Sequence, residues 1–339
     1  MIDLNTIWFI LIAILIAGYA ILDGFDLGVG ILHLFTKDES EKKINLNAIG
    51  PVWDGNEVWL ITAGGALFAA FPIVYATVFS SFYIALMLLL TALIFRAVSF
   101  EFRGKVDSIT FKKVWDYAFG LGSLFAALLL SVAYGNILKG IPIDENKIFH
   151  GSFFSLLNPY AIVIGLTGVV LFIMHGAIYM TLKTEETQLQ RMTKWATSCW
   201  MAFIILYLVA TFLTFFYSGF LFENITENPL FWILFLLLLL SIVYIPLGLK
   251  SQQYFKSFIA SSLIIFSAFS LSALSLYPRL VPSSINLNYS LNAYNASSSQ
   301  YTLKTMLIIA IIGMPVVIAY TIFIYRIFKG KVVITKDSY

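Results

Sequence analysis

The chain has 339 residues, of which 60% are hydrophobic and only 12% are charged, and its mean hydropathy is +0.89. Soluble domains carry about 25% charged residues, so this composition excludes an ordinary water-soluble domain. The net charge of +3 is small and gives no reason to expect a nucleic-acid partner.

Long apolar runs account for the missing charge. A helix needs about 20 such residues to cross a bilayer, and in lipid only helices and closed barrels satisfy all their backbone groups. Barrel strands appear as short alternating segments, whereas Phe231–Ile245 and Leu307–Ile324 do not alternate. The sequence therefore predicts an all-α membrane protein embedded in a lipid bilayer.

Nine apolar stretches are long enough to span, and short polar segments connect them, so we predict one polytopic membrane domain over residues 1–339. The second stretch is the least clearly defined of the nine, because Glu57 lies at its start and Pro72 near its end. The predicted spans lie near residues 7–35, 56–75, 78–100, 114–138, 157–182, 195–222, 229–249, 257–277 and 304–328.

Nine spans place alternate loops on opposite sides, and the basic residues divide very unevenly between these two sets of loops. One set, with the C-terminal tail, holds 17 and the other holds 4, which together make the 21 of the chain. The positive-inside rule assigns the larger set to the cytoplasm, so we predict an outside N-terminus and a cytoplasmic C-terminus. The larger set is Lys37, Lys42, Lys43, Arg96, Arg103, Lys105, Lys112, Lys113, Lys183, Arg191, Lys194, Lys250, Lys256, Arg326, Lys329, Lys331 and Lys336. The smaller set is Lys139, Lys147, Arg279 and Lys304.

Two aspartates, Asp23 and Asp26, lie inside the first span in the segment DGFDLGVG. At 1.5 Å per residue they are roughly 13–18 Å from the cytoplasmic end of that span near Phe35. Carboxylates at such depth usually face the bundle interior or a water-filled cavity, and a separation of three residues puts both on one helix face. They could relay protons, or each could make a structural hydrogen bond or cap a broken turn. The sequence leaves both interpretations open.

Three glycines accompany these aspartates. Gly24 and Gly28 form a small-xxx-small surface that allows another helix to approach closely, and Gly30 follows them. Their spacing does not fit a dinucleotide-binding motif, and no strand precedes them. We interpret them as packing residues.

A second pair of acids, Asp54 and Glu57, lies at the cytoplasmic mouth of the second span in the segment GPVWDGNEVW. The positive end of the helix dipole favours negative charge at this position, so helix capping is the simpler explanation. Alternatively, these acids admit protons from the cytoplasm and lead them to the pair in the first span, since a proton path needs such a chain.

The histidines do not predict a haem or metal site. His33 lies at the inner end of the first span, His150 lies in an outer loop, and only His175 lies within a span, beside Met174. Adjacent helix residues point in different directions, so these two side chains cannot clamp one haem. We interpret His175 as a hydrogen-bonded packing residue. Cys199 is the single cysteine, so the chain can form neither an internal disulfide nor a thiolate cluster.

Several motifs together resemble subunit II of the cytochrome bd quinol oxidases. They occur in the order and at about the spacing of that family, from the first helix to the last outer loop. The matching segments are Asp23–Gly30, Ile49–Pro72, Phe100–Lys105, Val114–Asp116, Tyr277–Ser284 and Asn295–Ser298.

The resemblance implies a role in aerobic respiration. In that family two related subunits of nine transmembrane helices form a heterodimer in the prokaryotic cell membrane. The complex oxidises quinol near the outer face and reduces oxygen to water, taking protons from the cytoplasm and releasing others outside. Haems b and d and the quinol site are expected in subunit I, and some complexes add a small third subunit. This chain would then carry no catalytic residue, no cofactor site and no metal site of its own.

For this chain the resemblance implies an assembly surface and cytoplasmic proton delivery. The carboxylate that matches Asp54 lies on such a path in the family, whereas Asp23, Asp26 and Glu57 carry over less directly. An alternative function is a proton-coupled secondary transporter, which would also contain buried acids near helix breaks. Transporters often show inverted repeats and paired interrupted helices, and we find no convincing repeat in this sequence.

The predicted topology can be tested with single cysteines in a Cys199-free protein. The charge asymmetry places Ser40 and Lys105 in the cytoplasm and Asn146 and Ser298 outside. An impermeant thiol reagent added to intact cells should therefore label cysteines at positions 146 and 298 only. Labelling at 40 or 105 would contradict the number of spans.

Overall fold

The computed structural model describes residues 3–223 and 225–334, so Met1, Ile2 and the tail residue Lys336 lie outside the described residues. It confirms the predicted all-α membrane fold. The helices are α1 (Leu4–His33), α2 (Glu39–Ile49), α3 (Trp53–Ala70), α4 (Pro72–Ser81), α5 (Tyr83–Phe102), α6 (Ile109–Lys139), α7 (Pro159–Lys183), α8 (Glu186–Tyr217), α9 (Pro229–Lys250), α10 (Tyr254–Leu276) and α11 (Gln300–Ile327). Two short strands, β1 (Arg279–Val281) and β2 (Leu291–Asn292), pair antiparallel before α11.

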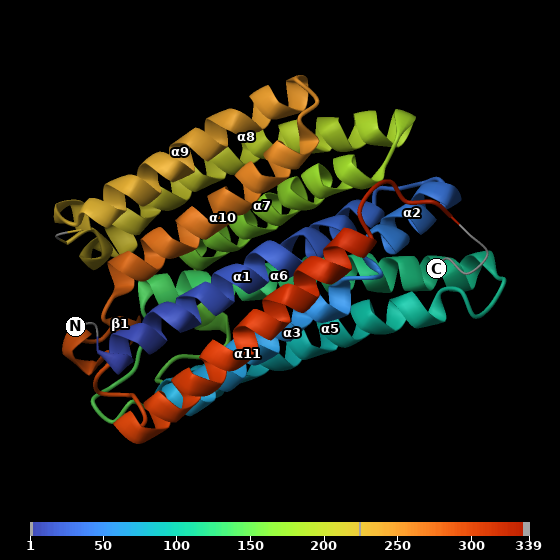
Figure 1. The fold of residues 1–339 in the computed structure, drawn as a ribbon. Coiled ribbons are helices and arrows are strands. Elements are labelled where there is room, and N and C mark those ends of the chain that lie inside the picture. Colours follow the sequence, from blue (N-terminus) through green and yellow to red (C-terminus); the bar gives the residue numbers. More distant parts are fainter. Residues whose placement is uncertain (1–2, 224, 335–339) are drawn as a thin grey trace.

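The long helices run side by side, and the chain passes repeatedly between the two ends of the bundle (Figure 1). Eight helices of the described chain are long and apolar enough to cross a membrane. The exception among the long helices is α3, whose first turns contain Asp54, Asn56 and Glu57. This helix corresponds to the second predicted span, which carries Glu57 at its start and Pro72 near its end.

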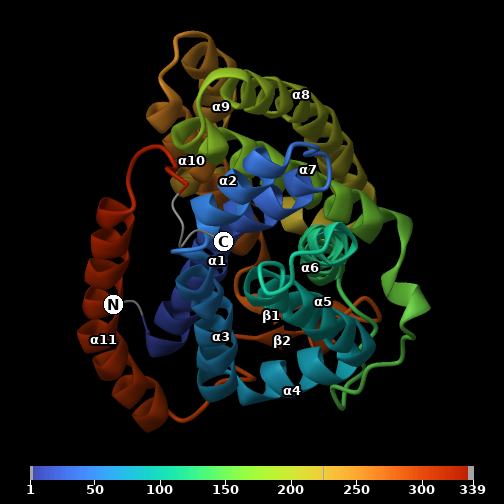
Figure 2. The ribbon, with the colours of Figure 1, turned by 90° about the vertical axis from the view of Figure 1, so that its right-hand side faces the viewer.

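The chain breaks between α3 and α4. Proline disfavours helical geometry in the residue before it, and Phe71, which precedes Pro72, has φ −133° and ψ 66°. The short helix α4 then runs across the direction of α3 (Figure 2), and α5 begins only at Tyr83. The second and third predicted spans, 56–75 and 78–100, thus correspond to helices at 53–70 and 83–102, with α4 between them.

Helix α1 forms the centre of the bundle, where it packs against α3, α6, α7 and α10. A Cβ atom at Gly28 would collide with the backbone oxygen of Phe172, and one at Gly30 would collide with Ser123. A Cβ at Gly24 would lie 2.8 Å from ring carbons of Phe172. The interpretation of these glycines as packing residues is confirmed, since only hydrogen side chains permit these approaches to α6 and α7.

The connecting segments gather at two opposite ends (Figure 1). At the end that contains β1 and β2, Asn5 donates to Ala293 O and the Ser298 amide donates to Ala70 O. At the opposite end, which we call the α2 end, Gln188 donates to Asn45 and the Val332 amide donates to Lys183 O. The members of the larger set of basic residues that the structure describes belong to the α2 half of the bundle, and the assignment of this end to the cytoplasm stays a prediction.

Candidate functional site

Acidic side chains from α1 and α3 meet an arginine from α5 inside the bundle, towards the α2 end. We call Asp23, Asp26, Asn56, Glu57 and Arg96 the acid cluster. Asp23, Asp26 and Arg96 are completely buried, and the Glu57 side chain is 18% exposed. The two first-span aspartates therefore face the bundle interior, as expected for carboxylates at membrane depth.

Asp23 forms an ion pair with Arg96. Its Oδ1 lies 2.6 Å from Arg96 Nη2, and its Oδ2 lies 3.4 Å from Nη1. The Tyr19 hydroxyl donates to the same Oδ2 at 2.8 Å. A guanidinium keeps its charge in proteins, so Asp23 is the partner that compensates this buried cation.

Glu57 adds a second, longer contact to the arginine. Its Oε2 lies 3.7 Å from Arg96 Nη1, and the guanidinium also lies over the Trp53 ring at 5.9 Å from the ring centroid. Arg96 thus connects the acid of α1 with the acid of α3. Because Glu57 is partly exposed while Asp23 is buried, the cluster extends inward from the surface of the chain.

Asp26 is held by neutral groups. The Asn56 amide donates to Asp26 Oδ2 at 2.7 Å and to the Leu22 carbonyl at 3.1 Å. The Tyr325 hydroxyl of α11 donates to Asn56 Oδ1 at 2.9 Å. The other oxygen of Asp26, Oδ1, is buried and has no hydrogen-bond partner among the described residues. Asp26 can therefore exchange a proton without breaking an ion pair, which Asp23 cannot.

Asp54 lies apart from these contacts, one turn before Glu57 on α3. It is exposed, and it makes no hydrogen bond or ion pair with the residues that the structure describes. The N-cap of α3 is Val52, without a side-chain hydrogen bond to the helix start. Asp54 therefore does not cap α3 by a hydrogen bond, although its charge still lies at the positive end of the helix dipole.

The sequence reasoning missed the role of Arg96, which it counted among the basic residues at the cytoplasmic end of the third span. Arg96 is instead fully buried within α5 and paired with Asp23. Its position six residues before the end of an apolar helix was the available signal, because an arginine inside a membrane span requires an acidic partner. Asn56 and Tyr325 gave no such signal, since uncharged polar residues are common near helix ends.

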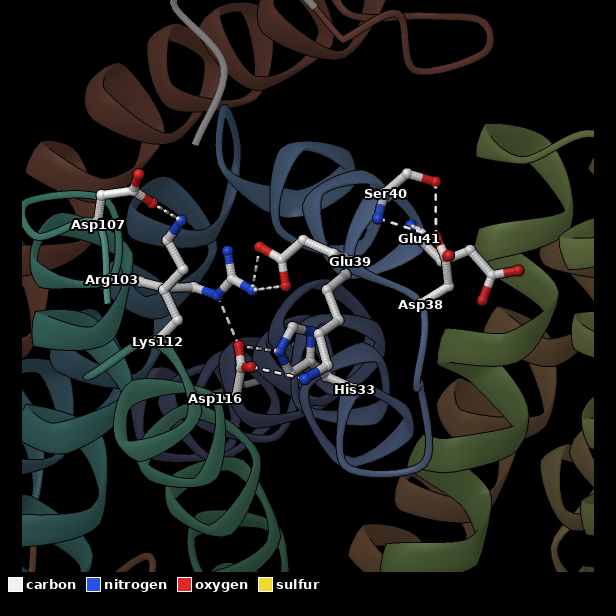
Figure 3. Close-up of polar contacts among 10 residues, drawn as sticks. His33, Asp38, Glu39, Ser40, Glu41, Arg103, Asp107, Lys112 and Asp116 are labelled. Carbon is white, nitrogen blue, oxygen red and sulfur yellow. Dashed lines mark hydrogen bonds and ion pairs between the residues drawn. The ribbon is translucent and has the colours of Figure 1, made fainter. Parts of the chain in front are cut away.

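A second polar cluster lies at the α2 end, around Asp116 of α6 (Figure 3). His33 Nε2 and Arg103 Nε contact Asp116 Oδ1 at 2.8 and 2.6 Å, and Lys42 Nζ donates to Oδ2 at 2.7 Å. Arg103 Nη2 also contacts both oxygens of Glu39 at 2.9 Å. These bonds join the end of α1, the helix α2, the α5–α6 connection and the start of α6.

The Asp116 cluster fixes the α2 end as one unit. Asp38 supports it by accepting from the Ser40 and Glu41 amides, which caps the first turn of α2 (Figure 3). Glu41 in turn pairs with Arg191 of α8. All these groups are engaged with one another, so we interpret the cluster as structural. It positions the first turns of α3, which follow α2 directly.

Each histidine of this chain is hydrogen-bonded to another group of the chain, and the buried Nδ1 of His33 has no hydrogen-bond partner among the described residues. Both ring nitrogens of His175 are engaged, Nδ1 with Ser261 Oγ at 2.7 Å and Nε2 with Ile21 O at 3.0 Å. His33 is bound to Asp116, and His150 is bound to Asp144 at 2.9 Å in an outer loop. No group of three or more metal-ligating side chains occurs in the described part of the chain. The interpretation of His175 as a hydrogen-bonded packing residue is confirmed.

The family model and the related proteins that match this chain all point to the same family. The family model described as "Cytochrome bd terminal oxidase subunit II" matches residues 4–328. "Cytochrome bd-I ubiquinol oxidase subunit 2" of Escherichia coli strain K12 is 32% identical over 366 residues, covering 99% of this chain and 96% of its own length. "Cytochrome bd ubiquinol oxidase subunit 2" of Bacillus subtilis strain 168 is 36% identical over 334 residues, covering 98% of each.

A solved structure shares the fold. The bd oxidase from Geobacillus thermodenitrificans contains a chain that matches with a TM-score of 0.76 at 19% sequence identity. The match covers 96% of this chain and 98% of that one. The match therefore extends over nearly the whole chain.

The buried ion pair makes a prediction for stability. Arg96→Met should lower the free energy of unfolding by about 3–5 kcal/mol, because it leaves Asp23 as an uncompensated buried charge. Adding Asp23→Asn to Arg96→Met removes that charge and should recover more than half of the loss. Thermal unfolding of the purified proteins in detergent measures both effects. A double variant as unstable as Arg96→Met alone would show that Asp23 is not the compensating partner.

Proposed function

This chain belongs to the family of cytochrome bd terminal oxidase subunit II, and from that premise we propose that it is the haem-free subunit of a quinol:oxygen oxidoreductase. The enzyme would lie in the cell membrane of a prokaryote, where this chain forms a heterodimer with a haem-bearing subunit I. Its own task is to support assembly and to deliver protons from the cytoplasm. The proposed proton delivery rests on one observation: acidic side chains follow one another from the exposed Asp54 to the buried acid cluster.

The overall reaction requires such delivery. Two quinols supply four electrons and release four protons at the outer face, and reduction of one oxygen molecule to two waters consumes four electrons and four protons. If the consumed protons come from the cytoplasm, charge is separated without a pump. Each charge moved across the membrane stores about 2.3 kcal/mol per 100 mV. Protons must therefore reach the site of oxygen reduction through protein of low polarity.

The geometry of α3 supports a route that starts at Asp54. Asp54 is exposed near the α2 end, and Glu57 follows it after one helical turn with its side chain 18% exposed. Residues three apart are neighbours on a helix surface. Glu57 faces Arg96, and Arg96 binds Asp23 and lies close to Asp26. Protons collected by Asp54 would pass to Glu57 and then to Asp26, while Arg96 and Asp23 hold the charges around them fixed.

The haems are proposed for the partner because His175, the histidine that the sequence places within a span, already uses both ring nitrogens. His175 uses both ring nitrogens in hydrogen bonds, and His33 binds Asp116. Haems b and d and the quinol site would then all lie in subunit I. A small third subunit is compatible with this arrangement.

The partner surface is proposed on α3 and α11. None of the residues in the most apolar part of α11 is buried, and Figure 2 shows α11 at the edge of the bundle. A Cβ atom added at Gly64 or Gly65 of α3, or at Gly313 of α11, would have no atom of the described chain within 4 Å beyond its sequence neighbours and the backbone of its own helix. Exposed glycines on membrane helices allow another helix to approach closely. A partner helix could therefore pack here without displacing any side chain.

The transporter alternative has no support in the comparisons. The matching family and the full-length relatives are oxidase subunits. The interrupted segment between α3 and α4 is also explained locally by Pro72.

The assignment of the haems to subunit I can be tested by purification through a tag on this chain. The complex should contain a second, haem-bearing subunit and show haem absorption. His175→Ala should leave that spectrum unchanged, because both ring nitrogens serve hydrogen bonds within this chain. A fully assembled His175→Ala complex that lacks one haem component would overturn the assignment.

Proton delivery through Asp54 is tested by Asp54→Asn in the assembled oxidase. Asparagine preserves the size of the side chain but cannot carry a proton. We expect normal haem content and normal reduction of the haems by quinol, while steady-state oxygen consumption falls several-fold. Oxygen consumption, haem absorption and single-turnover reduction by quinol measure these three quantities.

Asp107→Asn is the matched control for this experiment. Asp107 is also an exposed aspartate near the α2 end, but among the described residues it pairs with Lys112 alone, on the surface. Its substitution should leave oxygen consumption at the parent rate. If the Asp54→Asn oxidase also consumes oxygen at the parent rate between pH 6 and 8, protons do not enter through Asp54.

A further inference from the structure

The Asn56 side chain is fixed in one orientation by three partners. Its Nδ2 donates to Leu22 O at 3.1 Å and to Asp26 Oδ2 at 2.7 Å. Its Oδ1 accepts from the Tyr325 hydroxyl at 2.9 Å. A backbone carbonyl oxygen only accepts, so Leu22 requires the NH2 group of Asn56 on its side. Asn56 Oδ1 then faces Tyr325, whose hydroxyl donates to it. Asn56 is 2% exposed, so water does not compete for these bonds.

This orientation decides what Asn56 offers to Asp26. The amide NH2 group can stabilise the carboxylate form of Asp26, whereas the amide oxygen could only accept from its protonated form. Among the described residues, Asn56 is the single hydrogen-bond partner of Asp26. The neighbouring charged groups are Asp23, Arg96 and Glu57, and the phenols of Tyr179 and Tyr325 also lie close. The amide is therefore the only one of these groups that directly contacts the Asp26 carboxyl.

Tyr325 reaches Asn56 from a helix that makes few polar contacts with the other helices of the described chain. Between Leu303 and Phe328, the bond from Tyr325 to Asn56 is the one hydrogen bond that α11 makes to another helix in the described chain. At one end of α11, Trp8 donates to Leu303 O at 2.9 Å. At the other end, Lys183 donates to Phe328 O at 2.5 Å. These two hydrogen bonds hold the ends of α11 in place. The hydrogen bond from Tyr325 to Asn56 then connects α11 to the acid cluster.

We infer that Tyr325 is a positioning residue for proton transfer at Asp26, because its hydroxyl holds the Asn56 amide with the NH2 group towards the carboxyl. This inference rests on the proposed proton delivery. In the transfer step, protonated Asp26 releases its proton towards the partner subunit, and the resulting carboxylate is stabilised by Asn56. A proton from Glu57 then restores the acid, and no electron moves. Without the Tyr325 hydroxyl, the buried Oδ1 of Asn56 loses its hydrogen-bond partner, so the amide can shift away from Asp26. The carboxylate then loses its stabilising hydrogen bond, which disfavours proton release.

The test uses Tyr325→Phe in the assembled two-subunit oxidase. We expect unchanged haem content and unchanged reduction of the haems by quinol, but a several-fold fall in steady-state oxygen consumption. The ratio of turnover in H2O to turnover in D2O should rise, since proton release at Asp26 becomes slower. A purely structural role would lower turnover without raising this ratio. Parent turnover, or lowered turnover with an unchanged isotope ratio, would overturn the inference.

Tyr244→Phe is the matched control. The Tyr244 hydroxyl also donates to a side-chain amide oxygen, that of Gln253 at 3.0 Å, in the α9–α10 region away from the acids. Losing this bond should change neither oxygen consumption nor the isotope ratio.

A second comparison examines whether Tyr325 acts through Asn56. In an Asn56→Ala background, Tyr325→Phe should cause no further loss of turnover, because effects that share one partner are not additive. A further several-fold loss would show that Tyr325 acts by another route, and it would overturn the inference. The outcome is independent of Asp54. If Asp54→Asn has normal turnover while Tyr325→Phe slows the oxidase and raises the isotope ratio, the proposed entrance is wrong and the positioning role stands.

Discussion

A buried guanidinium is the constraint on which the rest of this structure depends. Arg96 lies completely inside a bundle of membrane-spanning helices, where an uncompensated charge costs several kcal/mol. Its charge must be met by an acid at close range, and Asp23 meets it at 2.6 Å. That distance requires α1 and α5 to be positioned accurately in the same bundle. The glycines of α1 help because they let α6 and α7 approach the central helix without side chains in between.

The ion pair also gives the two aspartates of α1 different chemical properties. They lie three residues apart on one helix, yet Asp23 faces a permanent cation and Asp26 faces a neutral amide. A carboxyl bound to a guanidinium has to break that pair in order to take up a proton. A carboxyl bound to an amide does not. Asp23 can therefore compensate the charge of Arg96 while Asp26 exchanges protons. This difference depends on which helix each of the two side chains faces.

The part of the bundle that is held together by polar contacts differs from the part that leaves apolar surface uncovered. At the α2 end, Asp116 joins His33, Lys42 and Arg103 (Figure 3), which fixes the segments that precede α3 and α6. Along one edge of the bundle, α11 exposes its apolar length and is tethered mainly at its ends (Figure 2). A protein that works beside a partner needs both regions. The rigid end holds the acids in place, and the uncovered helix leaves apolar surface for another chain.

The sequence by itself determined the fold class, because apolar runs of spanning length leave no alternative to helices in lipid. It also identified Asp23 and Asp26 as interior groups, since charged side chains at membrane depth have to avoid lipid. The tertiary structure alone decided the partners of these acids. Arg96, Asn56 and Tyr325 come from three helices that are distant in sequence, and periodicity within one helix cannot specify which neighbour its buried face meets. Pro72 was the one sign in the sequence of the break before α4. The result of that break is a short helix that lies across the bundle, and its direction depends on packing that only the folded chain provides.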